Sequence, residues 1–249
     1  SVRQTPQAVT DIMISPEPAT GRGRSRKTSG VRGPSSTMAC MRYTITFFQL
    51  TAEHHRSQRM RTDTAEPIRL KDYRPPEWVV DTVSLDILLH PTGTRVRAAL
   101  LIRPNPASAA APLVLDGDGL RLVSLKLDGT AVPDGSFVAT PDGLTIPQPP
   151  NRPFTLEVES IVDPAANTQL SGLYRSSATY CTQCEAEGFR RITYFPDRPD
   201  VMAVYTTRIE ADKAEAPALL ANGNLVEAGD APGGRHFAIW HDPHPKPSY

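Results

Sequence analysis

The segment from residue 181 to residue 200 carries the side chains with the clearest chemical potential. Cys181 and Cys184 have the spacing of half a structural zinc site, or of a redox-active thiol pair. Glu185 and Glu187 lie two residues apart, so both carboxylates would point the same way in an extended chain. Two carboxylates on one face form either a cation-binding site or a solvated edge, and the spacing alone fits both.

The two cysteines lack obvious partners for a metal. A structural zinc site needs four ligands, and the remaining candidates are Cys40 and the pair His241 and His244. A thioredoxin-like pair requires a βαβ setting, whereas this region is predicted to be strand and loop. We therefore expect Cys181 and Cys184 simply to pack, and an odd count of three cysteines is typical of a reducing, cytoplasmic compartment.

The elements that carry these residues are predicted to be strands. The chain has 25 prolines in 249 residues, which disfavours long helices. Val83, Leu85, Ile87 and Leu89 recur with period two, and after a turn at residues 91–94 a second strand is predicted over 95–103. Further strands are predicted over residues 122–127, 137–139, 144–146, 154–161, 191–195, 201–210, 225–228 and 236–240. Strands without intervening helices indicate an all-β fold, an antiparallel sandwich or saddle-shaped sheet, over residues 65–249.

Residues 1–64 differ in composition from the remainder. The stretch 21–30 is rich in Arg, Ser and Gly and has no large apolar side chain, so it cannot offset the entropy of ordering. A transit peptide and a basic nucleic-acid-binding arm are alternatives, and we expect a disordered leader that reflects an over-extended start before Met60. The net charge is zero and no run is long enough to span a membrane, so neither nucleic acid nor membrane is an expected partner.

Several motifs between residues 73 and 249 resemble the amino-terminal domain of bacterial-type aminopeptidase N, a zinc metalloaminopeptidase family. Besides residues 181–200, they occupy residues 164–168, 172–174, 206–213, 219–224 and 242–247, in the family's order. The resemblance implies that the Gln-x-Glu of Gln183 and Glu185 lies over the active site. Glu185 would meet the free α-ammonium group of a peptide substrate, and Gln183 would line the pocket for its first side chain.

The sequence also departs from the complete enzyme. It contains no His-Glu-x-x-His zinc motif, and neither His54-His55 nor the stretch 241–244 supplies one; the family's Gly-x-Met-Glu-Asn strand is missing too. The resemblance therefore implies a fragment that binds no zinc itself, is inactive alone, and works with a missing catalytic domain that holds zinc. Two alternatives are a free-standing β-module that binds a partner, and a small metal or redox protein built on the cysteine pair.

Overall fold

The computed structural model describes residues 69–109 and 111–249. The expected leader, residues 1–64, and the expected domain start at residue 65 lie outside this described part. The chain divides into two units, of which residues 18–73 contribute one described element, the 3₁₀ helix η1 (Leu70–Asp72). The other unit contains all the strands of the described residues, which begin after residue 74. Within the described residues, none of the helices has the length and apolar character needed to cross a membrane.

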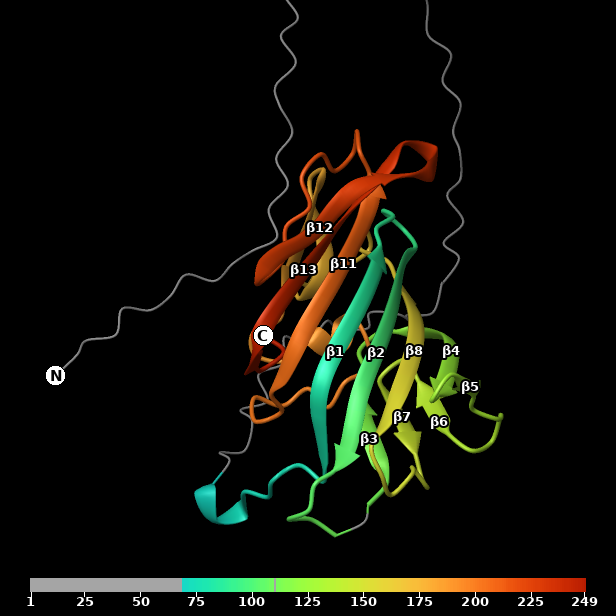
Figure 1. Ribbon diagram of the computed structural model, residues 1–249, viewed down its shortest axis with the longest axis vertical. Coiled ribbons are helices and arrows are strands. Elements are labelled where there is room, and N and C mark those ends of the chain that lie inside the picture. The colour runs from blue at the N-terminus through green and yellow to red at the C-terminus, as the bar shows by residue number, and fades with distance from the viewer. Residues whose placement is uncertain (1–68, 110) are drawn as a thin grey trace, which may run out of the picture. The chain divides into compact units, whose positions relative to one another are not determined.

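The strand-bearing unit is built on one eight-stranded sheet with the order β12-β13-β11-β1-β2-β8-β4-β5 (Figure 1). Its strands are β1 (Trp78–Leu88), β2 (Thr94–Pro104), β4 (Arg121–Leu127), β5 (Thr130–Ala131), β8 (Phe154–Val162), β11 (Ala203–Asp212), β12 (Asn224–Ala231) and β13 (Arg235–Lys246). The all-β prediction is confirmed. Neighbouring strands are antiparallel except β1 and β11, which run parallel at the centre of the sheet.

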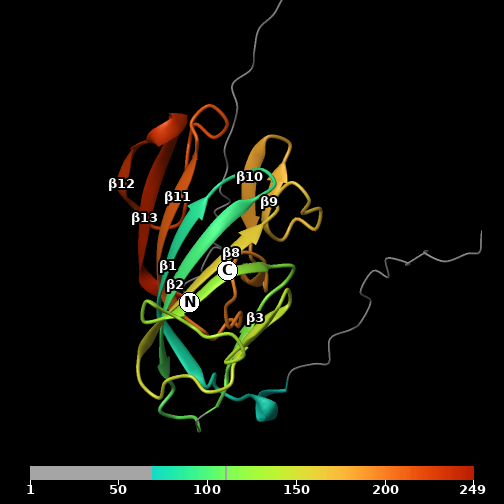
Figure 2. The ribbon, with the colours of Figure 1, turned by 90° about the vertical axis from the view of Figure 1, so that its right-hand side faces the viewer.

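Two smaller sheets lie on the same side of the large sheet (Figure 2). One has the order β3-β7-β6, from β3 (Leu113–Asp116), β6 (Val138–Thr140) and β7 (Gly143–Ile146). The other is the hairpin of β9 (Gly172–Ser176) and β10 (Thr179–Gln183). From Val83 onward in β1, and throughout β8, every second side chain is buried, including Leu85, Ile87 and Leu156, so the apolar face is turned toward these sheets.

The opposite face of the large sheet carries a row of paired charges. Arg208 of β11 contacts Asp86 of β1 at 2.8 Å and Glu210 at 2.6 Å. Glu210 in turn accepts from Arg235 of β13 at 2.7 Å, and Asp86 also pairs with Arg97 of β2 at 3.4 Å. The row therefore ties four adjacent strands together across one half-exposed face.

The predicted strand over residues 191–195 is wrong. Residues 189–191 form the 3₁₀ helix η2 (Phe189–Arg191), and only Phe195 pairs as a strand residue, in an isolated bridge to Asp116. Phe189 and Phe195 meet edge to face at 5.0 Å between ring centroids, and the amide of Ile192 donates to the carbonyl of Phe189. Burial of these aromatic rings overrides the β preference of the sequence Ile-Thr-Tyr-Phe.

Candidate functional site

Gln183 and Glu185 stand at the exit of the β9–β10 hairpin. Gln183 is the last residue of β10 and pairs with Gly172 of β9, so its backbone is held by the hairpin. Glu185 is exposed and begins a turn over residues 185–188. Its amide lies 3.4 Å from the side-chain Oε1 of Gln183, so the structure brings these two residues together.

Glu187 does not share a face with Glu185 in the way an extended chain would require. The chain turns at these residues, and Glu187 Oε2 pairs with Nη2 of Arg190 at 3.3 Å. The idea of a two-carboxylate cation site rested on extended geometry, which is absent at these residues. Glu185 is therefore a single exposed carboxylate and not one half of a pair with Glu187.

Gly188 closes the loop at its base. Its amide donates to the carbonyl of Cys184 at 2.8 Å. A Cβ at this position would lie 2.4 Å from the carbonyl oxygen of Gln183 and 2.7 Å from Cα of Cys184, both of them backbone atoms. Only glycine fits this close approach, and spacing alone does not distinguish Gly188 from an ordinary turn glycine.

Asp197 is buried and forms an ion pair with the partly exposed Arg190. Asp197 is 1% exposed, and its Oδ2 accepts from the backbone amide of Arg190 at 3.1 Å and from Arg190 Nε at 3.2 Å. Its other oxygen, Oδ1, accepts from the hydroxyl of Ser248 at 2.6 Å. The amide of Asp197 donates to Oδ2 of Asp116 at 3.0 Å. The spacing of residues in the sequence does not reveal this pairing.

Cys181 and Cys184 are reduced thiols in different surroundings. Cys181 is buried in β10 and lines a small apolar cavity with Ile87 and Leu219. Burial, with a further contribution from the negative charge of Asp197, raises the pKa of the Cys184 thiol to about 12. Cys184 is therefore protonated at neutral pH and is a poor metal ligand or nucleophile.

The described residues do not offer a metal-binding cluster. In residues 69–109 and 111–249 no three His, Cys, Asp or Glu side chains gather closely enough to hold a metal ion. His241 uses Nδ1 in a 3.0 Å hydrogen bond with Thr206. Cys40, the remaining sequence candidate, lies outside the described part of the chain.

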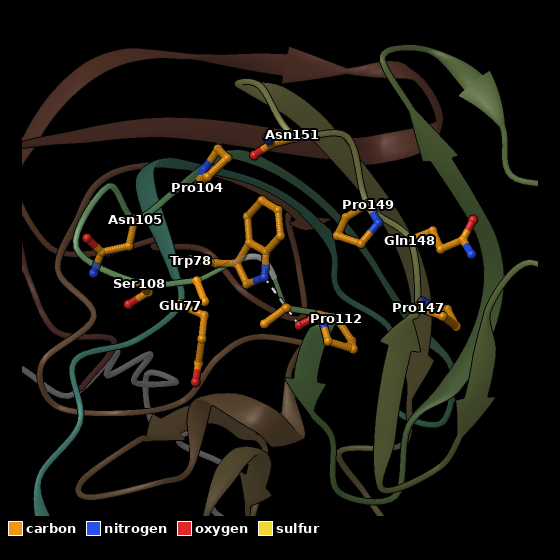
Figure 3. A pocket seen from close by; sticks show the side chains of 12 residues that line it. Glu77, Trp78, Pro104, Asn105, Ser108, Pro112, Pro147, Gln148, Pro149 and Asn151 are labelled. Atoms are coloured by element: carbon orange, nitrogen blue, oxygen red, sulfur yellow. Dashed lines mark hydrogen bonds between the residues drawn. The ribbon is translucent and has the colours of Figure 1, made fainter.

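A separate hollow of about 240 Å³ surrounds Trp78 (Figure 3). The indole Nε1 of Trp78 donates to the carbonyl of Pro112 at 3.2 Å, and the ring meets Phe154 edge to face. Pro104, Pro147 and other residues around it belong to strand ends and connections, and none comes from the loop of residues 183–188. We interpret the hollow as a feature of packing between the β1–β2 end and the small sheet.

The fold and the loop together define a class of protein domain. It is an all-β domain with an exposed carboxylate on the loop after the β9–β10 hairpin, and the ion pair of Arg190 and Asp197 supports that loop. The chain belongs to the Peptidase M1 N-terminal domain family, whose model matches residues 81–249. The resemblance found in the sequence is thereby confirmed.

Relatives and solved structures agree with this assignment. The chain is 51% identical over 190 residues to Aminopeptidase N of Caulobacter vibrioides, covering 76% of this chain and 22% of that protein. It is 46% identical to Aminopeptidase N of Escherichia coli, with 72% and 20% covered. A crystal structure of Legionella pneumophila aminopeptidase A in complex with aspartic acid superposes with a TM-score of 0.68 at 39% identity, over 73% of this chain and 22% of that one. The chain thus spans about a fifth of the length of these proteins.

A more distant structure shares the fold alone. The M1 zinc metallopeptidase of Deinococcus radiodurans superposes with a TM-score of 0.58 at 18% identity, covering 69% of this chain and 40% of that one. The zinc in that protein's name has no fitting set of ligands among the described residues here, because the side chains needed are not brought together.

Proposed function

We propose that this chain is the amine-recognition part of a zinc aminopeptidase. Glu185 pairs with the free α-ammonium group of a peptide substrate, and Gln183 helps line the pocket for the first side chain. The observation that carries the proposal is the position of Glu185, an exposed carboxylate on a loop whose base is fixed by Gly188 and by the Arg190–Asp197 pair.

The chemistry suits an exopeptidase. Nearly every free amino terminus shares one charge, its ammonium, and a carboxylate recognises that charge through a short, charge-assisted hydrogen bond. When the rest of an active site closes over Glu185, a blocked amine leaves this carboxylate desolvated and unpaired, which is strongly unfavourable. A substrate with an internal peptide bond at this place is rejected for the same reason.

We further propose that residues 1–249 alone do not hydrolyse peptides. The sequence contains no His-Glu-x-x-His, so the zinc and the water it activates belong to residues outside this chain. The role of residues 69–249 is then to bind and orient the substrate's amino end. Chelator-sensitive release of alanine by the pure chain would contradict this.

A chimeric enzyme tests the role of Glu185 directly. This chain replaces the matching part of the Caulobacter vibrioides relative, and hydrolysis of aminoacyl p-nitroanilides is measured. Because Glu185→Gln removes a charged hydrogen bond, we expect KM to rise about 10- to 100-fold. Glu187→Gln is the matched control, since Glu187 already pairs with Arg190 and is expected to change KM by less than about twofold.

Two further results decide the proposal. Gln183→Ala is expected to change the relative kcat/KM among substrates with different first residues more than it changes recognition of the amine. Equal KM values for Glu185→Gln and Glu187→Gln would refute amine recognition by Glu185 and would favour a binding module without this role.

A further inference from the structure

We infer that Asp197 is a positioning residue for the amine-recognition loop, which it fixes to the chain segment after β13. The inference rests on the proposed function of Glu185. It adds that Asp197 sets the position of Glu185. Asp197 touches no substrate in this scheme and acts through the loop.

One side of Asp197 is fastened to the loop. Its Oδ2 accepts from both the backbone amide and Nε of Arg190, and its carbonyl accepts from Arg190 Nη2 at 3.0 Å. The helix η2, which contains Arg190, follows the turn directly, because the amide of Arg191 donates to the carbonyl of Gly188 at 3.1 Å. Arg190 therefore joins the turn that begins at Glu185 to a carboxylate that lies beneath it.

The other side of Asp197 is fastened to residues distant in sequence. Oδ1 accepts from the hydroxyl of Ser248, just after β13, across a separation of 51 residues. The amide of Asp197 donates to Asp116 at the end of β3, 81 residues away. Three segments of the chain therefore meet at Asp197: the amine-recognition loop, the end of β3 and the segment after β13.

The surroundings make this junction rigid. Asp197 is 1% exposed, so losing a partner would leave a buried polar group unpaired, which is costly. Its charge contributes, after burial, to the raised pKa values of Cys184 and Tyr205. In a longer protein of this family the segment at Ser248 leads onward, so the junction would place Glu185 relative to the parts that follow.

Hydrogen exchange in the full 249-residue chain tests the junction without any assumption about activity. Asp197→Asn keeps the shape but presents an amide to Arg190, and Ser248→Ala removes one hydrogen bond without leaving an unpaired charge. We expect amide exchange in residues 184–192 to accelerate about tenfold in Asp197→Asn and a few-fold in Ser248→Ala, with β1 and β2 unchanged. Asp81→Asn, which breaks a surface ion pair with Arg103, is the control and is expected to leave the loop unchanged.

Kinetics in the chimera then tests the link to recognition. We expect Asp197→Asn and Ser248→Ala to raise KM for aminoacyl substrates while kcat changes by less than about twofold, because the loop binds the substrate and does no chemistry. Loop exchange equal to that of Asp81→Asn, or acceleration spread equally over the whole sheet, would overturn the positioning role. Accelerated loop exchange together with an ineffective Glu185→Gln would keep the junction and reject only the proposed function.

Discussion

The close approach at Gly188 gives a sharp test of the loop geometry. The substitution Gly188→Ala would place a methyl group 2.4 Å from the carbonyl oxygen of Gln183 and 2.7 Å from Cα of Cys184. Both neighbours are backbone atoms, so the loop must move as a whole and weaken the 2.8 Å bond from Gly188 to Cys184. Overpacking of this kind costs about 1–3 kcal/mol. For a domain of this size that corresponds to a Tm lower by roughly 2–12 °C.

Gly93→Ala is the matched control. A Cβ at Gly93 would meet nothing nearer than Nδ1 of His90 at 3.8 Å, so alanine fits there and, by restricting the unfolded chain, changes stability little or slightly upward. Thermal unfolding of the two variants, followed by circular dichroism, measures the difference. Equal Tm values for Gly188→Ala and Gly93→Ala would refute the tight loop base described for this structure.

Two further predictions concern titration. Burial alone would raise the pKa of Glu210, but hydrogen bonds from Arg208 and Arg235 outweigh burial and lower that pKa. The ionised Glu210 carboxylate therefore stabilises the fold above about pH 4.5, and this stabilisation is lost as the pH falls through the pKa of Glu210 in the folded chain. Glu210→Gln is therefore expected to cost about 1 kcal/mol in urea unfolding at neutral pH and to flatten the acid dependence, whereas Glu227→Gln on exposed β12 should do neither. Because burial raises the pKa of the Cys184 thiol to about 12, little thiolate is present in the folded chain, so iodoacetamide should label Cys184 at least about tenfold more slowly than in urea, as measured by peptide mass spectrometry. Equal labelling rates would contradict the burial of this thiol.

Local alternation was enough to predict most of the large sheet. The period-two pattern from Val83 onward predicted the second half of β1, and the turn at residues 91–94 predicted its pairing with β2. The strand β3 was harder to recognise, because only four residues separate the proline at 112 from the glycine at 117. The hairpin β9–β10 has too little apolar alternation to predict strands, since it is built around Tyr180, Arg175 and Glu215.

The candidate site was predictable in composition but not in geometry. Gln183 and Glu185 were singled out by a motif, and the structure places them beside each other at the hairpin exit. The braces beneath them were not predictable, because Asp197 meets Ser248 only after the chain has passed through three more strands. The turn at Glu185 likewise depends on the close fit of Gly188, which spacing alone does not reveal.

The parallel pairing of β1 with β11 also constrains how the chain can fold during synthesis. Thr82 pairs with Val204, so 122 residues separate partners at the centre of the sheet, whereas β2 and β8 can pair as soon as residue 162 is made. Until β11 leaves the ribosome, β1 is the unprotected edge of a partial sheet and is open to pairing with other chains. Non-local closure of this kind is slow. The nascent chain is thus most vulnerable to aggregation between the synthesis of β8 and that of β11, the interval that also encodes the loop of Gln183 and Glu185.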